Sequence, residues 1–278
     1  MSRLSVVIVN YNTRDLLRNC LLSLRDSTLP AEIIVVDNAS DDGSAEMVAA
    51  EFPNVRLLAQ TENRWFCGGN NLGISAATGE YVLLLNPDTT VKPDALATLV
   101  DFMDANPDYA GATAQLQYPD GRVQRTCSRV PSYAYLLAAH TPLGVIARGW
   151  RARLRRHHWY VDEGFDRTHS RDVAVMPGSC LLMRRNSLWL NERLRLYYPE
   201  DDLGRRFAGQ RFRFVAAAQV IHHEKAATAN WDAQQVYFSD LMVYTWMHHG
   251  SGRAVLLLLL SRPLWVAIWL RQRLARLT

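Results

Sequence analysis

The sequence predicts one α/β domain with a mainly parallel sheet flanked by helices, followed by a helical C-terminal segment. Over the first hundred residues, apolar β-branched runs alternate with helical patterns. This alternation is typical of parallel strands joined by right-handed crossovers. A fully apolar run at residues 81–85 then ends abruptly in Asn86-Pro87-Asp88-Thr89. Open α/β sheets bind ligands where strands end in this way, so we expect the site there.

Local patterns place the elements of the first half. Apolar side chains recur at helical spacing over residues 13–25, where Thr13 is a candidate cap, and Pro93 suits the first turn of a later helix. We expect strands at residues 4–10, 32–37, 55–59 and 81–85, and helices at residues 13–25, 42–52, 70–78 and 93–103.

The pattern changes after residue 109. The sequence Tyr-Pro-Asp-Gly-Arg at 118–122 predicts a hairpin turn, and residues 132–158 form a helical insertion that is first apolar and then strongly basic. Strand character returns at 174–183, a short helix follows at 200–210, and the last strands lie at 212–223. We therefore expect a domain over residues 1–230, with halves at 1–108 and 109–230, and C-terminal helices at 231–278.

Charge is unevenly distributed along the chain. Its 278 residues are 49% hydrophobic and 21% charged, which excludes a disordered protein, and the net charge is +4. The arginines gather in two groups, which favours phosphate or anionic surfaces as partners. The groups are Arg148, Arg151, Arg153, Arg155 and Arg156 in the insertion, and Arg262, Arg271, Arg273 and Arg276 near the C-terminus. No nucleic-acid recognition motif accompanies them, so we expect no nucleic acid as a partner.

The cysteines and the N-terminus bear on location. Cys20, Cys67, Cys127 and Cys180 show no paired spacing, which favours reduced thiols in a cytosolic protein over a zinc site or a disulfide framework. The N-terminus lacks the charged start, long apolar core and cleavage site of a signal peptide.

The tail contains two apolar runs, 254–260 and 264–270, separated by a Ser-Arg-Pro sequence. A spanning helix needs about 20 apolar residues in a row, so each run is too short. Trp265 and Trp269, with basic flanks, favour a helix that lies at a membrane surface. A helix packed on the core is the alternative.

Polar residues end the strands of the first half. Asn10 and Tyr11 close the first strand, and Asp37 and Asn38 close the second. Taken singly, each is better explained as a cap or turn residue. Because the carboxyl ends of parallel strands meet at one edge, their agreement favours contacts to a base or ribose beside Asp88. A carboxylate there suits a hard cation that neutralises phosphate oxygens.

Residues 63–73 are rich in glycine and asparagine. Two adjacent glycines before a helix let backbone N–H groups approach a ligand closely. Taken alone, the stretch is better explained as a plain loop. It is not a P-loop, because the required Gly-Lys-Ser/Thr is missing.

Four segments occur in a characteristic order: Val-Ile-Val-Asn-Tyr-Asn at 7–12, Ile-Ile-Val-Val-Asp-Asn-Ala-Ser-Asp-Asp-Gly-Ser at 33–44, Gly-Gly-Asn-Asn-Leu-Gly-Ile at 68–74, and Leu-Leu-Leu-Asn-Pro-Asp-Thr at 83–89. Together they resemble the family-2 glycosyltransferases, most of all the bacterial rhamnosyltransferase-like branch, over residues 4–228. The resemblance implies the A-type glycosyltransferase fold with its Rossmann-like sheet. It also implies a nucleotide-diphosphate sugar donor, a divalent cation (Mg²⁺ or Mn²⁺) and inversion at the anomeric carbon.

The resemblance also implies a donor site. Its expected members are Asn10, Tyr11, Asp37 and Asn38 at the nucleoside, and Asn63, Asn70, Asn71 and Asn86 around the donor pocket. Asp88 is the metal-ligating end of the family's Asp-x-Asp motif, whose first position is Asn86 here. One acid fewer weakens fixed metal coordination. Trp65 and Cys67 stand where the family usually has glycine, so this loop departs from the family pattern.

The second half supplies acid–base chemistry. Residues 197–206, Tyr-Tyr-Pro-Glu-Asp-Asp-Leu-Gly-Arg-Arg, are similar to the family's Tyr-Phe-Glu-Asp-x-Asp-Leu segment with one residue fewer. An inverting transfer needs a carboxylate that takes the proton of the attacking hydroxyl. We expect Asp201 in this role, with Glu200 as the alternative and Asp202 as a helix cap. Three adjacent carboxylates raise the pKa of at least one, and a purely acidic cap is the competing explanation.

Other second-half residues have expected roles with open alternatives. His222 is similar to the family's late histidine and either ligates the metal, contacts the diphosphate or is structural. Pro-Gly-Ser at 177–179 resembles a family loop under the acceptor site. Arg205 or Arg206 either meets the diphosphate or lies on a solvated helix face.

The expected function is an inverting glycosyltransferase that uses dTDP-L-rhamnose. Its acceptor is a glycan or a polyprenyl-diphosphate-linked sugar in cell-surface polysaccharide synthesis, such as that of cell wall or O-antigen. We expect it in the cytoplasm, peripheral on the inner face of the cytoplasmic membrane. The alternatives are a UDP- or GDP-sugar donor, a catalytically silent binding subunit and a nucleotidyltransferase. Asn-Tyr-Asn-Thr at 10–13 argues against the last, because it is neither basic nor glycine-rich.

Overall fold

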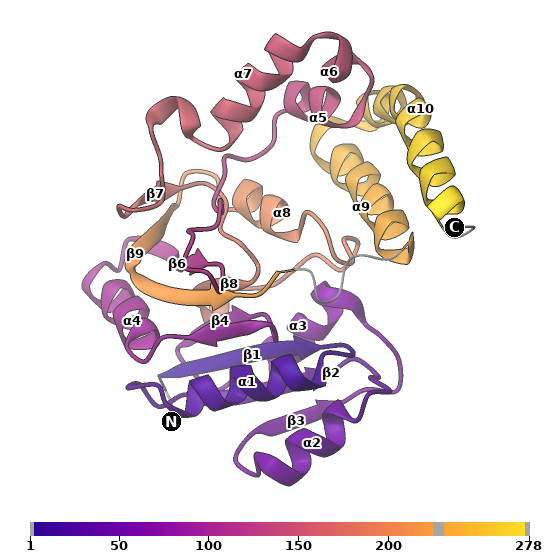
Figure 1. Ribbon diagram of the computed structural model, residues 1–278. Helices are drawn as coiled ribbons and strands as arrows, with labels where there is room; N and C mark the ends of the chain where they lie inside the picture. Colours follow the sequence, from indigo (N-terminus) through magenta and orange to yellow (C-terminus); the bar gives the residue numbers. More distant parts are fainter. Residues whose placement is uncertain (1–2, 225–230, 276–278) are drawn as a thin grey trace.

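The computed structural model describes residues 3–224 and 231–275 (Figure 1). Within these residues the chain forms one sheet of nine strands. The strands are β1 (Leu4–Asn10), β2 (Glu32–Asp37), β3 (Arg56–Ala59), β4 (Tyr81–Leu85), β5 (Thr89–Val91), β6 (Tyr109–Gln117), β7 (Arg171–Val173), β8 (Cys180–Arg184) and β9 (Arg211–His222). Their order is β3-β2-β1-β4-β8-β6-β9-β5, with β7 paired to β9.

Helices lie on both faces of this sheet. They are α1 (Arg14–Arg25), α2 (Ser44–Glu51), α3 (Trp65–Ala76), α4 (Ala95–Ala105), α5 (Tyr133–His140), α6 (Leu143–Ile146), α7 (Arg148–His158), α8 (Pro199–Arg206), α9 (Trp231–His249) and α10 (Ser251–Ala275), with 3₁₀ turns at Val161–Glu163 and Arg185–Ser187. Buried side chains of α1, α2 and α4 belong to one core cluster, and those of α3, α8 and α9 belong to the other. The sheet therefore separates two cores.

The first half has the predicted parallel pattern. β2 and β4 both pair in parallel with β1, and β3 pairs in parallel with β2. Three strands have the predicted bounds, and α1 begins one residue after Thr13. Thr13 does not cap α1 with its side chain. Its hydroxyl instead donates to the side chain of Asn10, which brings it into the site described below.

The glycine-rich stretch differs from its prediction. It is helix rather than loop, because α3 already begins at Trp65, five residues before the predicted start. A Cβ atom on Gly69 would lie 2.8 Å from Val9 Cγ1, and one on Gly73 would lie 2.3 Å from Val7 Cγ1. The glycines let α3 pack directly on β1, and they do not open the backbone to a ligand.

The second half makes the sheet mixed. β8 runs antiparallel between β4 and β6, and β5 is antiparallel to β9, although β6 and β9 are parallel. The prediction of a mainly parallel sheet is therefore wrong for this half, because the chain returns from the helical insertion in the opposite direction. The turn at 118–122 forms as predicted, but only an isolated bridge, between Gln117 and Val123, follows it.

The C-terminal helices form a hairpin beside the insertion (Figure 1). α10 continues through Pro263 and packs on α9 and α5. Ala254, Leu257 and Ser261 are its buried residues. Among the residues described, no helix is long and apolar enough to cross a bilayer. The predicted boundary at residue 230, Arg276 and the side chains of Arg271 and Arg273 lie outside the described part.

Candidate active site

The carboxyl ends of three strands meet at one edge of the sheet. Asn10 at the end of β1 is in register with Asp37 at the end of β2, and Ile8 is in register with Leu85 at the end of β4. Asn86 and Asp88 follow β4 directly. The fold thus brings together the polar strand ends that the sequence singles out.

Asn10 and Asp37 bind each other at this edge. The Asn10 amide donates to Asp37 Oδ1 at 2.9 Å and to Ser40 Oγ at 3.1 Å, and its carbonyl accepts from Thr13. Both residues are buried. The Asn10 side chain is therefore fully occupied in holding Asp37, whose carboxylate has further lone pairs for a ligand. Tyr11, next in the chain, is 45% exposed.

Asn38 presents an unpaired acceptor. Its amide donates to the carbonyl of Trp65 at 3.0 Å, while its Oδ1 atom is buried and has no partner among the described residues. A buried acceptor left without a hydrogen bond costs about 1–3 kcal/mol. A donor group of a ligand at this edge would remove that cost.

The other asparagines differ in their availability. The side chain of Asn71 hydrogen-bonds to the backbone of Leu190 and to the carboxylate of Glu192, so it anchors the loop that contains these residues to α3. The Asn70 amide donates to the carbonyl of Phe66 within the helix. Asn63 accepts from the amide of Trp65. Asn86, by contrast, is half-buried, and its side chain makes no hydrogen bond with any described residue.

Asp88 and His222 face each other. Asp88 Oδ1 lies 3.4 Å from His222 Nε2, and Asp88 is 8% exposed. Gln124 donates to the His222 carbonyl at 2.7 Å, which turns its own Oε1 atom toward His222 Nδ1 at 2.9 Å. That acceptor places the imidazole proton on Nδ1, so a neutral ring turns its Nε2 lone pair toward the carboxylate.

Two lone-pair donors in contact repel each other unless a cation lies between them. The pair therefore fits a divalent cation, with one oxygen and one imidazole ligand and Gln124 as the residue that orients the ring. No group of three or more His, Cys, Asp or Glu side chains able to hold a metal occurs among the described residues. The remaining ligands would have to come from substrate phosphates or water.

Glu200 and Asp201 begin α8 on the other side of the loop at 177–179. The Gly178 amide donates to Glu200 Oε1 at 3.0 Å, while Ser179 accepts from the amide of Asn86 at 3.2 Å. One short loop thus ties the end of β4 to Glu200, the neighbour of Asp201 in the chain. The predicted halves of the site, far apart in sequence, lie next to each other.

Burial dominates the acid–base properties of this pair. It raises the pKa of Glu200 to about 7. Burial also raises the pKa of Asp201 well above its usual value, and the charge of Glu200 raises it further, while Arg205 lowers it. Asp201 accepts no hydrogen bond from any residue that the structure describes, so its carboxylate is available to a substrate. A carboxylate with these properties suits a general base near neutral pH.

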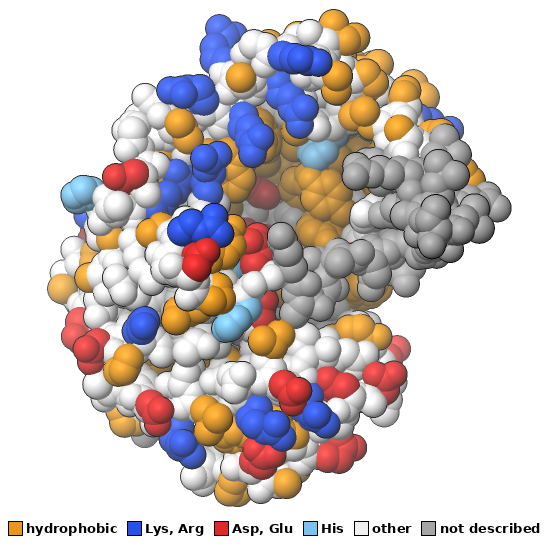
Figure 2. Space-filling view, in the orientation of Figure 1, with side chains coloured by type: hydrophobic (Ala, Val, Ile, Leu, Met, Phe, Trp, Pro, Cys, Tyr) orange, Lys and Arg blue, Asp and Glu red, His pale blue; other side chains and the backbone are white. Residues whose placement is uncertain are grey.

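The carboxylates lie beside a wall of aromatic rings. The Tyr198 hydroxyl lies 3.2 Å from His140 Nε2 and 3.0 Å from the hydroxyl of Tyr237. Burial lowers the pKa of His140 to about 4, so this ring is neutral at physiological pH. Figure 2 shows a hollow between the helical insertion and the sheet, with hydrophobic and acidic side chains at its base.

The remaining charged groups of α8 are structural. Asp202 does not cap the helix as predicted, because it is buried and accepts from Arg206 at 2.8 Å and from His248 at 2.9 Å. Arg205 donates to the Tyr244 hydroxyl and to the carbonyl of Pro131. Both arginines are thus engaged with protein groups.

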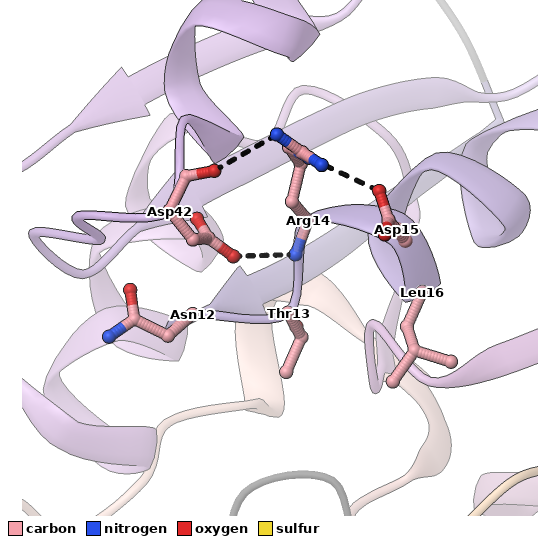
Figure 3. Close-up of a pocket in the computed structure, with 6 residues that line it drawn as sticks. All are labelled: Asn12, Thr13, Arg14, Asp15, Leu16 and Asp42. Carbon is pink, nitrogen blue, oxygen red and sulfur yellow. Dashed lines mark hydrogen bonds and ion pairs between the residues drawn. The ribbon is translucent and has the colours of Figure 1, made fainter.

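Figure 3 shows a pocket of about 400 Å³ at the start of α1, and Thr13, which binds the Asn10 side chain, is one of the residues that line it. Arg14 donates there to Asp42 through its backbone amide at 2.8 Å and to Asp15 through its side chain at 3.1 Å. The charged groups of this pocket are therefore paired with one another.

The family model for "Glycosyl transferase family 2" matches residues 5–189, two thirds of the chain. The chain belongs to glycosyl transferase family 2. It is a glycosyltransferase, as the resemblance predicts. The matched region contains the carboxyl ends of β1, β2 and β4, whereas Glu200, Asp201 and His222 lie beyond it.

Several relatives extend this assignment. The chain is 28% identical over 277 residues to an N-acetylglucosaminyl-diphospho-decaprenol L-rhamnosyltransferase of Mycobacterium tuberculosis, covering 91% of this chain and 87% of the relative. It is 26% identical to an undecaprenyl-phosphate 4-deoxy-4-formamido-L-arabinose transferase of Serratia proteamaculans, covering 63% and 55%. It is 38% identical to the succinoglycan biosynthesis protein ExoO of Rhizobium meliloti, covering 36% and 29%.

Solved structures of S. aureus TarS share the fold of this family-2 enzyme. The form spanning residues 1–349 matches with a TM-score of 0.56 at 15% identity, over 90% of this chain and 74% of TarS 1–349. A longer TarS structure matches with a TM-score of 0.55 at 14% identity, over 88% of this chain and 40% of that one. The A-type α/β architecture is thereby confirmed.

The structure also explains one departure from the family pattern. Trp65, which stands where family-2 enzymes usually have glycine, has a φ of 58°, in the left-handed region that favours glycine. Asn63 holds its amide and Asn38 holds its carbonyl. These two bonds hold Trp65 in this conformation beside the end of β2.

Sequence reasoning missed the residue that fixes the catalytic segment. Asp240 on α9 is fully buried, and its Oδ2 atom accepts from the amides of Arg195, Leu196 and Tyr197 at 3.1, 2.8 and 2.9 Å. Those amides lead directly into α8. The available signal is that residues 233–252 contain no other Asp, Glu, Lys or Arg. This signal does not say which loop the acid holds.

Proposed function

We propose that this glycosyltransferase transfers L-rhamnose from dTDP-L-rhamnose to a polyprenyl-diphosphate-linked sugar, with inversion at the anomeric carbon. The observation that carries the proposal is the unpaired Asp201 carboxylate, next in the chain to Glu200, whose carboxylate one short loop connects to the sheet edge where we place the donor. The choice of sugar and acceptor is supported by the mycobacterial relative, a rhamnosyltransferase whose acceptor is a decaprenyl-diphosphate-linked N-acetylglucosamine by name. A catalytically silent subunit would have no need to keep a buried carboxylate without a partner.

The donor would lie across the carboxyl ends of β1, β2 and β4. Asp37 would accept from the ribose or base, and the orphaned Asn38 Oδ1 atom would accept from a base or sugar N–H or O–H group. Asn86, which makes no hydrogen bond with described residues through its side chain, would meet the diphosphate or sugar. Asn10 would not contact the donor itself and would fix the orientation of the Asp37 carboxylate.

Asp88 and His222 would hold a divalent cation next to the donor diphosphate. When bound, such an ion neutralises charge that develops on the departing nucleoside diphosphate. Gln124 keeps the proton of His222 on Nδ1 and leaves Nε2 free. Mg²⁺ and Mn²⁺ both fit the oxygen ligand, and the imidazole favours Mn²⁺.

Asp201 would remove the proton from the acceptor hydroxyl, which attacks the anomeric carbon on the face opposite the nucleotide. Burial and then the charge of Glu200 keep the pKa of Asp201 high, and the Gly178 amide holds Glu200 in place. Because the acceptor would be lipid-linked, the enzyme would work peripherally on the inner face of the cytoplasmic membrane.

Purified enzyme, Mn²⁺ and a short-chain polyprenyl-diphosphate N-acetylglucosamine test the proposal. We expect product with dTDP-L-rhamnose and at least tenfold less with UDP- or GDP-sugars. Product with inverted anomeric configuration supports the mechanism. Preference for a UDP- or GDP-sugar would reject the rhamnose assignment, and retention of configuration would reject Asp201 as the base.

A further inference from the structure

Exposed apolar side chains gather at one end of the molecule, where the insertion α5–α7 meets α10. We call this surface the platform, and its apolar members are Leu143, Val145 and Ile146 on α6 and Val255, Leu256 and Leu259 on α10. α5 joins the two parts, because it contacts both α6 and α10. Figure 2 shows hydrophobic and basic side chains side by side over this end of the molecule.

α6 is built to present its side chains outward. Its buried residue is Gly144, where a Cβ atom would lie 1.8 Å from the carbonyl oxygen of Ala138. Glycine thus lets the short helix rest directly on α5. Leu143 and Val145, on either side of it, are 41% and 46% exposed, and Ile146 is 81% exposed. Three neighbouring exposed apolar side chains on one short helix form a patch of the kind that marks an interaction surface.

α10 has two different faces. Leu257 and Ser261 are fully buried against the neighbouring helices. Val255 and Leu259 are 55% and 58% exposed on the other face. One face of α10 therefore packs on the neighbouring helices, and the other face exposes apolar side chains.

Charge identifies the kind of partner. Residues 121–161 and 241–278, which include the platform, contain no aspartate or glutamate but 13 of the chain's 31 lysines and arginines. Arg148, Arg151, Arg153, Arg155 and Arg156 on α7 are exposed, and none pairs with an acid within the described part of the chain. A second copy packed face to face would bring these charges together, which is unfavourable. An anionic lipid surface satisfies both the arginines and the apolar side chains.

The platform also adjoins the catalytic hollow. Tyr135 on α5 stacks on His158 of α7, with the ring centroids 4.0 Å apart. Burial raises the pKa of Tyr135, and the charge of Asp201 also raises it. Figure 2 shows basic side chains along the upper rim of the hollow. Docking by the platform would therefore bring the hollow to the headgroup layer, where the diphosphate of a lipid-linked acceptor lies.

We propose that the α6–α7–α10 platform docks the enzyme on an anionic phospholipid bilayer, with Leu143, Ile146 and Leu259 inserted at the interface and the α7 arginines against the headgroups. The inference rests on the proposed function in one respect, because a lipid-linked acceptor is the reason for the enzyme to bind a membrane. The exposure and the charge of the platform residues are properties of the protein itself and do not depend on which sugar it transfers.

Co-sedimentation of the full chain with vesicles tests this directly. We expect at least tenfold stronger partitioning onto vesicles with 30% phosphatidylglycerol than onto pure phosphatidylcholine, and weaker binding at 0.5 M salt than at 0.1 M. Leu143→Ser with Ile146→Ser should weaken binding to the anionic vesicles by tenfold or more. Arg148→Glu with Arg156→Glu should weaken it by roughly five-fold or more per arginine.

Matched variants complete the test. Trp189→Ser removes an apolar side chain, 48% exposed, that lies outside the platform, and Arg25→Glu reverses an exposed arginine of α1. Neither should change vesicle binding. Transfer to a water-soluble acceptor analogue should be unchanged in all four variants, which separates docking from catalysis.

Each outcome has a distinct meaning. If the wild-type protein does not bind anionic vesicles but transfers sugar in solution, the docking proposal is wrong and the proposed function is unaffected. Platform variants that bind vesicles as the wild type does would also overturn it. A wild-type dimer in sedimentation velocity that Ile146→Ser dissociates, without any vesicle binding, would assign the surface to a second copy instead.

Discussion

The backbone amide of Gly178 donates a 3.0 Å hydrogen bond to Glu200 Oε1, and this bond joins the two halves of the site. A Cβ atom at position 178 would lie 2.2 Å from the same oxygen. The contact therefore depends on the absence of a side chain. The next residue, Ser179, binds the backbone that leads to Asp88, so a single turn sets the distance between donor edge and base.

Replacing Gly178 by alanine should separate these halves. The new methyl group displaces Glu200 and, with it, the start of α8, so we expect transfer to fall by about 10²-fold or more. We also expect a loss of about 1–3 kcal/mol in the free energy of unfolding. Activity assays and urea unfolding measure both. Gly149→Ala is the matched control, because Cβ there meets nothing within 4 Å. An active Gly178→Ala enzyme would show that the loop does not set this distance.

Glu200→Gln should change the pH dependence of transfer. The charge of Glu200 raises the pKa of Asp201, so its removal lowers that pKa and moves the acid limb of the kcat profile to lower pH. Glutamine keeps the acceptor for Gly178. Glu62→Gln, at an exposed carboxylate, is the control and should leave the profile in place. Loss of all turnover in Glu200→Gln would instead identify Glu200 as the base.

The same substitution should stabilise the protein above neutral pH. The folded pKa of Glu200 is about 7 against an ordinary 4.5, so the fold favours its protonated form. The stability that this preference contributes is present at low pH and is lost as the pH rises from 4.5 to about 7. Glutamine cannot ionise, so we expect the variant to gain about 1–3 kcal/mol on the parent between pH 5 and pH 8. Thermal unfolding at both pH values measures the gain.

Asp240 should affect catalysis without touching a substrate. Asp240→Ala leaves three amides of the 195–197 loop without their acceptor, which should cost about 3–5 kcal/mol. Asp240→Asn retains one carbonyl oxygen and should cost less. In the folded Asn variant we expect a lower kcat with an unchanged donor Kd, because the loop positions α8 and not the nucleotide edge. A donor Kd that rises in parallel with the fall in kcat would refute this division.

Gln124 should tune the metal through His222. Gln124→Ala frees the imidazole to change tautomer, so we expect Mn²⁺ activation to need about 10- to 100-fold more metal. Calorimetry of nucleotide-sugar binding at varied Mn²⁺ measures the effect. Gln210→Ala, at an exposed position after α8, is the control. An unchanged metal requirement in Gln124→Ala would remove His222 from the metal site.

Local patterns were sufficient for much of the donor half. The strands at 4–10, 32–37 and 81–85 are predictable from their apolar, β-branched residues alone. Their polar ends fall on one edge of the sheet because the strands pair in parallel. The start of α3 is not predictable in the same way, because its glycines locally indicate a loop and only their contact with β1 explains a helix.

Long-range contacts could not be foreseen in the same way. β8 lies antiparallel between β4 and β6 because of the path of the chain after the insertion, which no local period encodes. Asp240 accepts from three loop amides, and Asp202 binds Arg206 and His248. The bonds of Asp240 and the bond of Asp202 to His248 depend on where α9 packs. Asp202 was expected to be a cap, because acids at a helix start usually are.

The central claim is that Asp201 takes the proton from the acceptor hydroxyl, and Asp201→Asn tests it most directly. Asparagine keeps the shape but cannot accept the proton. We expect transfer from dTDP-L-rhamnose to fall by about 10³-fold or more while the calorimetric donor Kd stays within about twofold of the parent. Turnover within tenfold of the parent, with an unchanged pH profile, would contradict the account and place the base elsewhere.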